Sequence, residues 1–200
     1  MIVVTGHCRS GSSLVMQTLK HIGLDIAGHE YHDDFPVRAG NPKGYYDLSF
    51  QEVFLGIGAE YANKAVKLFG RRLPKIEHPS MVSHGIVCVR EDYKAQDIST
   101  KKVIELELEV EGDSEVRTLV LDRMKDLSMS DIAGYRRKTY KAAYTYLSEN
   151  NIPYLKVKFE DMLGNPEETI KNIVKFLGVT CNKRKLAAAL ENVGYDNISI

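Results

Sequence analysis

The chain has 200 residues, and its 27 lysines and arginines balance 27 aspartates and glutamates, so the formal net charge is zero. This length suits a single α/β domain over residues 1–200, large enough to bury a sizeable core. The balanced charge argues against a general nucleic-acid-binding protein and against a protein that binds acidic membrane surfaces, because both classes need a net basic face.

The three cysteines, Cys8, Cys88 and Cys181, are widely spaced and odd in number, which favours neither a disulfide framework nor a zinc site. The chain opens directly into an apolar segment, without the charged and apolar regions of a signal peptide. No apolar run approaches the roughly 20 residues that span a bilayer. We therefore expect a soluble, cytoplasmic protein that does not contact a membrane.

In the first third of the chain, the apolar run 2–4 predicts a strand. Apolar residues recurring from Leu14 to Ile22 predict a helix that Gly23 ends. A polar stretch follows, and a second helix is expected from about Ser49 to Phe69.

Two segments in the middle of the chain read as strands. The apolar run 85–89, which ends at Arg90, predicts a short buried strand. Over 104–110, isoleucine, leucine and valine alternate strictly with glutamate, which predicts an edge strand with one solvated acidic face. A charged helix is the competing interpretation.

The last third continues the alternation of strands and helices. Residues 118–121 predict a buried strand, 130–150 a helix and 154–159 another strand. A helix then begins with Asn165 as its N-cap and ends at Gly178. Apolar strands alternating with helices predict a mainly parallel sheet covered on both faces.

The most informative motif is the run from Thr5 to Ser13, between the first strand and the first helix. Gly6 and Gly11 keep the spacing of a Walker A loop, but Ser12 stands at the position of its lysine. A positive charge lies upstream instead, at Arg9. Backbone N–H groups and the helix dipole can still hold an oxyanion here. We therefore predict a phosphate-like ligand other than ATP.

Three segments together resemble the sulfotransferase family that uses 3′-phosphoadenosine 5′-phosphosulfate (PAPS). The first is the loop itself, in which Arg9-Ser10-Gly11-Ser12 is similar to the [KR]-S-G-[TS] core of the family's 5′-phosphosulfate loop. The second is Asn41–Tyr46, similar to the N-P-K-G-Y segment of a bacterial branch. The third is Lys158–Leu163, followed by Asn165–Thr169 and Phe176–Gly178, similar to the family's C-terminal motifs.

The resemblance implies a three-layer α/β/α fold of the P-loop NTPase type, and PAPS as the cosubstrate. Sulfuryl transfer needs positive charge at the transferring oxygens and a base for the acceptor. Arg9 would be both cofactor ligand and catalytic electrophile, and Ser10, Gly11, Ser12 and Ser13 would complete the binding loop. Because sulfate esters carry less charge than phosphate esters, no metal ion is expected.

The family also requires a site for the 3′-phosphate, made by an arginine after a strand and a serine further on. Arg123 with Ser130 is our preferred pair, and Arg90 with Ser99 is the competitor. Arginine suits this role because it binds phosphate through two parallel charge-assisted hydrogen bonds.

For the catalytic base, Glu30 and His32 are the candidates, with Asp47 and His7 behind them. A metal site at His29 and His32 is disfavoured, because no helix periodicity places the two side chains on one face. The acceptor is expected to be a small molecule or glycan with a hydroxyl or amine, and its identity and the oligomeric state stay open.

Two other functions compete with a sulfotransferase. A P-loop kinase for nucleotides or small molecules would need a lysine in the loop, and that lysine is missing. A non-catalytic nucleotide-binding domain would keep the loop and lack turnover.

Overall fold

The computed structural model describes residues 1–28, 46, 48, 56–109 and 126–194, with the backbone alone for 106–109. Within these residues the fold is α/β, and the sheet is parallel throughout, with the strand order β2-β1-β3-β4. The strands are β1 (Ile2–Gly6), β2 (Ala65–Phe69), β3 (His84–Val89) and β4 (Tyr154–Lys158).

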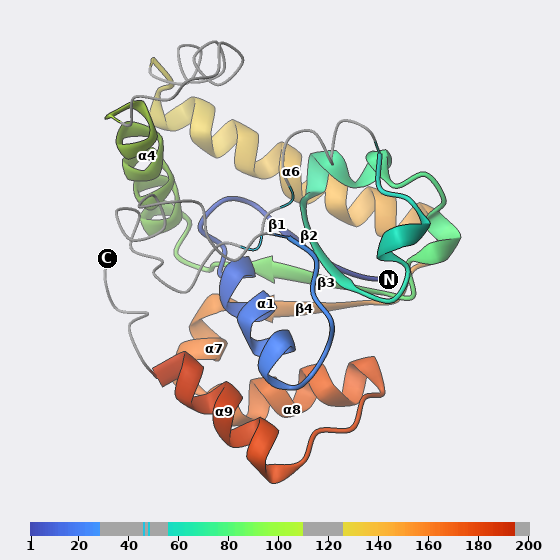
Figure 1. Ribbon diagram of the computed structural model, residues 1–200. Helices are drawn as coiled ribbons and strands as arrows, with labels where there is room; N and C mark the ends of the chain where they lie inside the picture. Colours follow the sequence, from blue (N-terminus) through green and yellow to red (C-terminus); the bar gives the residue numbers. More distant parts are fainter. Residues whose placement is uncertain (29–45, 47, 49–55, 110–125, 195–200) are drawn as a thin grey trace.

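Helices cover both faces of this sheet (Figure 1). They are α1 (Ser12–His21), α4 (Tyr93–Glu109), α6 (Met129–Glu149), α7 (Phe159–Gly164), α8 (Pro166–Leu177) and α9 (Lys183–Gly194). Short 3-10 helices also occur: η1 (Ala59–Tyr61), η2 (Gly70–Lys75) and η3 (Pro79–Met81). None of the described helices combines the length and apolar character needed to cross a bilayer.

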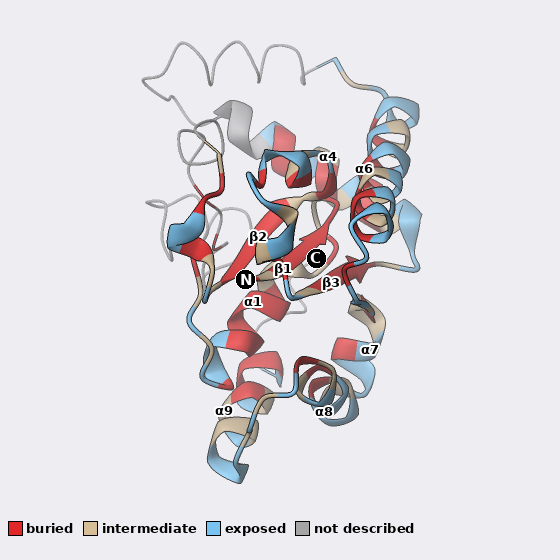
Figure 2. Ribbon diagram, turned by 90° about the vertical axis from the view of Figure 1, so that its right-hand side faces the viewer, coloured by how far each residue is buried: buried red, intermediate tan, exposed pale blue. Residues whose placement is uncertain are grey.

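The core consists of two apolar clusters, one on each face of the sheet. Because side chains alternate along a strand, Val3 and Val87 join one cluster with residues of α6. Val4 and Ile86 join the other with residues of α1, α8 and α9. Figure 2 shows the buried strands between helices whose outer faces are exposed. This arrangement is consistent with a three-layer α/β/α fold.

Most of the predicted elements are confirmed. The expected strands at 2–4, 85–89 and 154–159 correspond to β1, β3 and β4, and the helix predicted over 130–150 is α6. The helices predicted at Leu14–Ile22 and after Asn165 are α1 and α8. The predicted strand 118–121 lies outside the described residues.

The predicted termini of α8 and α6 differ in detail. α8 begins at Pro166 and ends before Gly178, whose φ of 64° is left-handed, as the sequence predicts. The Asn165 side chain, however, donates to the Glu168 carboxylate at 2.6 Å instead of capping a backbone N–H. α6 begins one residue earlier than predicted, because Ser128 caps it.

The helix predicted over 49–69 is wrong for its described part. Residues 65–69 form β2 next to β1, and within the described residues 56–64 the helical segment is the one turn of η1. Ala65, Val66 and Leu68 are all buried, which fits a parallel strand with both faces covered.

The edge strand predicted over 104–110 is also wrong through Glu109, because these residues continue α4. The helix starts well upstream, where the Asp92 carboxylate accepts a hydrogen bond from the Ala95 N–H at 2.8 Å. Leucine and glutamate both favour helix, so a helix capped at Asp92 continues through the alternating segment. The competing interpretation, a charged helix, is the correct one here.

Candidate functional site

The β1–α1 loop, residues 7–11, leaves the carboxyl end of β1, where parallel sheets bind their ligands. The loop contains a tight turn, in which the Ser10 N–H donates to the His7 carbonyl at 3.2 Å. Gly11 precedes α1 with a φ of 85°, and no side chain caps the helix. The first turn of α1 holds no acidic residue, so its N–H groups and dipole favour an anion.

Both glycines of the motif are required by close contacts. A Cβ on Gly6 would lie 2.5 Å from the Ser10 hydroxyl oxygen and 2.6 Å from the Cys88 carbonyl oxygen. A Cβ on Gly11 would lie 2.7 Å from the Phe159 ring, at a left-handed φ. The loop therefore packs directly on β3 and on the start of α7.

A lysine from β2 brings a second positive charge to the loop, which has a serine at the position of the Walker A lysine. Lys67 is 7% exposed, and its ammonium donates to the Ser13 hydroxyl at 3.0 Å. Lys67 was not predicted as a site residue because it lies within the helix predicted over 49–69. The usable signal was a lone lysine between the apolar residues Val66 and Leu68.

Cys88 of β3, which lies opposite Gly6 of β1, is not a nucleophile. Cys88 pairs with Gly6, and burial raises the pKa of its thiol to about 12, although the Lys67 charge opposes this shift. The thiol is therefore protonated at neutral pH, which excludes thiolate chemistry at this position.

Arg90 follows β3 directly, beside the loop. β3 pairs with β1 in parallel, with Cys88 opposite Gly6, so Arg90 emerges at the same edge of the sheet as the loop. Its guanidinium lies 5.0 Å from the centre of the Phe159 ring. The Nε atom is buried and has no hydrogen-bond partner among the described residues. A buried donor of this kind is costly unless a ligand accepts from it.

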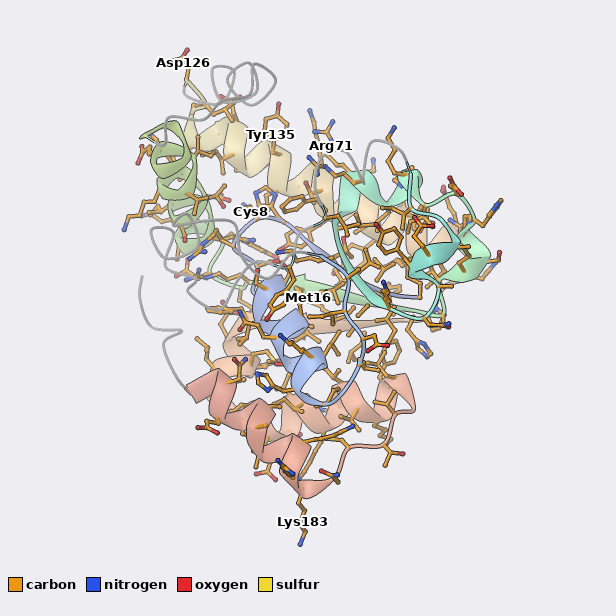
Figure 3. The ribbon with its side chains drawn as sticks, in the orientation of Figure 1. Cys8, Met16, Arg71, Asp126, Tyr135 and Lys183 are labelled. Atoms are coloured by element: carbon orange, nitrogen blue, oxygen red, sulfur yellow. The ribbon has the colours of Figure 1, made fainter. Side chains whose placement is uncertain are left out.

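One face of α4 holds the loop. Gln96 Nε2 donates to the Cys8 carbonyl at 2.9 Å, and the Thr100 hydroxyl lies 3.4 Å from the same oxygen. Arg9 Nε donates to the Ser99 hydroxyl at 2.8 Å. Figure 3 shows Cys8 between α4 and α1. Arg9 itself has a φ of 60°, a left-handed conformation that is rare for a residue with a side chain.

A buried ion pair fixes α4 to α6. Arg136 Nε and Nη2 donate to the two carboxylate oxygens of Asp97 at 2.8 and 3.1 Å. The Arg136 guanidinium also lies 4.2 Å from the centre of the Tyr93 ring. This two-pronged geometry gives the pair a defined orientation.

His7 lies in the loop close to this ion pair. Burial lowers the pKa of its imidazole to about 4, while Asp97 raises the pKa and Arg136 lowers it. Its Nε2 atom is buried and has no hydrogen-bond partner in the described part of the chain. The imidazole is therefore neutral at pH 7.

The lowered pKa of His7 predicts a pH-dependent stability. Below pH 6.5 the unfolded chain takes up a proton at His7, whereas the folded chain does so only near pH 4. The contribution is present in full above pH 6.5 and is lost as the pH falls to about 4. Relative to His7→Gln, the wild type is expected to lose about 2–3 kcal/mol of unfolding free energy across this window. Urea unfolding between pH 7 and pH 4 measures it, and parallel curves for the two proteins would contradict it.

The predicted site residues divide into two groups. The structure brings Arg9 and Ser10–Ser13 together with Arg90 and Ser99 at one edge of the sheet. Ser130 is exposed in the first turn of α6. Figure 3 places Asp126, just before this helix, far from Cys8. The other predicted residues, Arg123, Glu30, His32, Asp47 and His29, lie outside the described residues.

Comparisons with known proteins give no family assignment: no protein-family model and no curated protein matches the chain. Within the described residues, no three histidine, cysteine, aspartate or glutamate side chains gather where they could hold a metal ion.

Proposed function

We propose that this chain is a sulfotransferase with a P-loop NTPase-like fold, which passes the sulfuryl group of PAPS to a hydroxyl or amine of an acceptor. The observation that carries the proposal is a second arginine beside the loop, Arg90, whose buried Nε has no hydrogen-bond partner among the described residues. A nucleotide with phosphates at both the 3′ and 5′ positions needs two cationic sites. The loop with Arg9 is the first, and Arg90 is the second.

The residues of the loop fit a phosphosulfate group. The Ser10 hydroxyl oxygen is buried without a hydrogen-bond partner in the described part of the chain, so an anion would satisfy it. Bound PAPS supplies an activated sulfuryl group on a phosphate leaving group. Arg9 and the N–H groups of Ser12 and Ser13 would hold this end of the molecule and stabilise the charge that develops on it.

Lys67 favours this chemistry over that of a kinase. In a Walker A loop the hydroxyl at the position of Ser13 ligates Mg²⁺. Here that hydroxyl accepts a hydrogen bond from the Lys67 ammonium, so a fixed positive charge lies where the metal ion would bind. Two positive charges in one buried place repel each other. Lys67 would instead contact the transferring oxygens directly.

For the 3′-phosphate, the placement of Arg90 and Ser99 supports this pair over Arg123 and Ser130. Arg90 lies at the sheet edge beside the loop, and the Ser99 hydroxyl accepts a hydrogen bond from Arg9 Nε in that loop. Ser130 lies on an exposed helix turn instead. Glu30 and His32 stay the proposed bases, and His7, whose pKa is lowered to about 4, is a weak alternative base.

Thermal unfolding with added nucleotides tests the proposed function. A ligand at 100 times its Kd stabilises the folded chain by about 2.7 kcal/mol, which raises Tm. We expect a shift with adenosine 3′,5′-bisphosphate in the absence of metal and a smaller one with ATP and Mg²⁺. A shift with ATP and Mg²⁺ alone would contradict the proposal. Bisphosphate binding without sulfate transfer to any of a panel of phenols, alcohols and amines would favour a non-catalytic binding domain.

Replacing Arg90 with alanine distinguishes between the two residue pairs considered for the 3′-phosphate, Arg90 with Ser99 and Arg123 with Ser130. We expect Arg90→Ala to weaken adenosine 3′,5′-bisphosphate binding by about 10- to 100-fold, the loss of one or two hydrogen bonds to a charged group. Adenosine 5′-monophosphate should bind as it does to the wild type. Calorimetric titration of both ligands measures this, with Arg123→Ala as the matched comparison. A loss of the 3′ preference in Arg123→Ala alone would restore the pair Arg123 and Ser130.

A further inference from the structure

We infer that Gln96 on α4 is a positioning residue for the β1–α1 loop, because it locks the orientation of the Cys8–Arg9 peptide. The inference rests on the proposed function only in assuming that the loop binds an anion. Gln96 is fully buried, and its Nε2 donates to the Cys8 carbonyl at 2.9 Å. The Thr100 hydroxyl, one helical turn further along α4, lies 3.4 Å from the same oxygen and makes its shorter hydrogen bond, 2.9 Å, to the Gln96 carbonyl of its own helix.

The planarity of the peptide bond turns this contact into control of a hydrogen-bond donor. In a trans peptide the C=O and the following N–H point in opposite directions. With the Cys8 carbonyl held against α4, the Arg9 N–H must point away from that helix. If this peptide flipped, it would exchange an N–H for a carbonyl oxygen, which repels an anion. The left-handed φ of 60° at Arg9 makes such a lock necessary, because the conformation is unfavourable on its own.

The chemistry of Gln96 indicates that it is kept for this contact. Its Nε2 also donates to the Tyr140 hydroxyl of α6 at 3.3 Å, so the glutamine joins the loop, α4 and α6. Its Oε1 is buried and has no hydrogen-bond partner among the described residues. An unpaired buried oxygen lowers stability, and an apolar side chain of the same length would avoid that cost. Methionine in its place should therefore fold well, losing the hydrogen bond to the Cys8 carbonyl and the longer one to the Tyr140 hydroxyl.

Hydrogen exchange of the ligand-free chain tests the lock directly. We expect Gln96→Met to speed exchange of the loop amides by about tenfold, the loss of one hydrogen bond, without lowering Tm. The matched control is Gln17→Met, which removes another buried helix glutamine, one that accepts from Asn192 of α9. Unchanged loop exchange in Gln96→Met, or an equal rise along the whole of α4, would overturn the inference.

Binding of two isomeric nucleotides tests whether the orientation of the Cys8–Arg9 peptide affects anion binding by the loop. Gln96→Met should weaken adenosine 5′-monophosphate, which would use the loop, by about tenfold, and adenosine 3′-monophosphate much less. A merely structural role would weaken both equally, which would overturn the inference. If the wild type binds neither ligand, the proposed function fails, and the exchange measurement still decides whether Gln96 locks the loop.

If Gln96→Met does not fold, Thr100→Val decides the question. This variant removes the hydroxyl that lies 3.4 Å from the Cys8 carbonyl and leaves Gln96 in place. Its control is Thr139→Val, since the Thr139 hydroxyl also donates to a carbonyl one turn back in its own helix, as Thr100 does. Faster loop exchange in Thr100→Val alone supports the lock, and equal exchange in both variants overturns it.

Discussion

Replacing Asp97 with alanine is expected to lower the free energy of unfolding by about 3–5 kcal/mol. The variant leaves the Arg136 guanidinium buried without its carboxylate, and the two side chains are only 8% and 11% exposed. Removing one partner of a buried pair is much more costly than removing both, because a lone charge is left in a medium of low polarity. Urea unfolding at pH 7 measures the loss.

An exposed pair supplies the control for this prediction. Glu167 and Lys171 lie one turn apart on α8 at 2.6 Å, and both side chains are more than half exposed. Glu167→Ala should cost less than about 1 kcal/mol, because water and salt screen such pairs. The double variant Asp97→Ala, Arg136→Met should recover much of the lost stability. If Asp97→Ala costs no more than Glu167→Ala, then the Asp97–Arg136 pair does not hold α4 to α6.

Replacing Arg9 with alanine is expected to lower the rate of sulfate transfer by about 10²- to 10³-fold, the usual loss when one group that stabilises the transition-state charge is removed. The side chain is partly exposed at the loop, and Ser99 orients its Nε. The measurement is release of adenosine 3′,5′-bisphosphate from PAPS in the presence of an acceptor. Ligand-free stability should change little, because the lost hydrogen bond is only partly buried.

Two further variants sharpen that experiment. Arg184→Ala removes an exposed arginine from α9 and should leave the rate unchanged. Arg9→Lys keeps the charge and loses the planar guanidinium, so an intermediate rate is expected. Transfer at the wild-type rate in Arg9→Ala would remove Arg9 from the proposed catalytic role and leave the loop N–H groups and the Lys67 ammonium to stabilise the transferring group.

The fold could be predicted wherever local signals and tertiary packing agree. β1 and β3 are short apolar runs, β4 lies between the end of α6 and α7 where the alternation of helices and strands predicts it, and Pro166 and Gly178 mark the ends of α8 in the sequence as in the structure. β2 was missed because five residues carry little local signal and were included in the helix predicted over 49–69. Its conformation depends on β1, which pairs with it. Pairing of this kind is invisible in one sequence.

The site shows the same division between local and long-range information. The loop glycines and Arg9 belong to one continuous motif, so their spacing alone indicates an anion site. Lys67 and Gln96 reach the loop from β2 and from α4, far along the chain. No spacing rule connects them to the motif, and only the parallel pairing of β1 with β2 and β3 brings these segments together.

The place of β1 inside the sheet has a consequence for how the protein is made. β1 is synthesised before both of the strands that flank it, and β4 comes later still. Every pairing in the sheet therefore joins distant parts of the chain, a topology of high contact order that folds slowly. On the ribosome, a nascent chain that ends before β3 has an apolar β1 with an unpaired edge, which is a target for aggregation and for chaperones. The loop contacts that α4 makes through Gln96 cannot form until synthesis has passed α4, so a ligand of the proposed site cannot assist the early steps of folding.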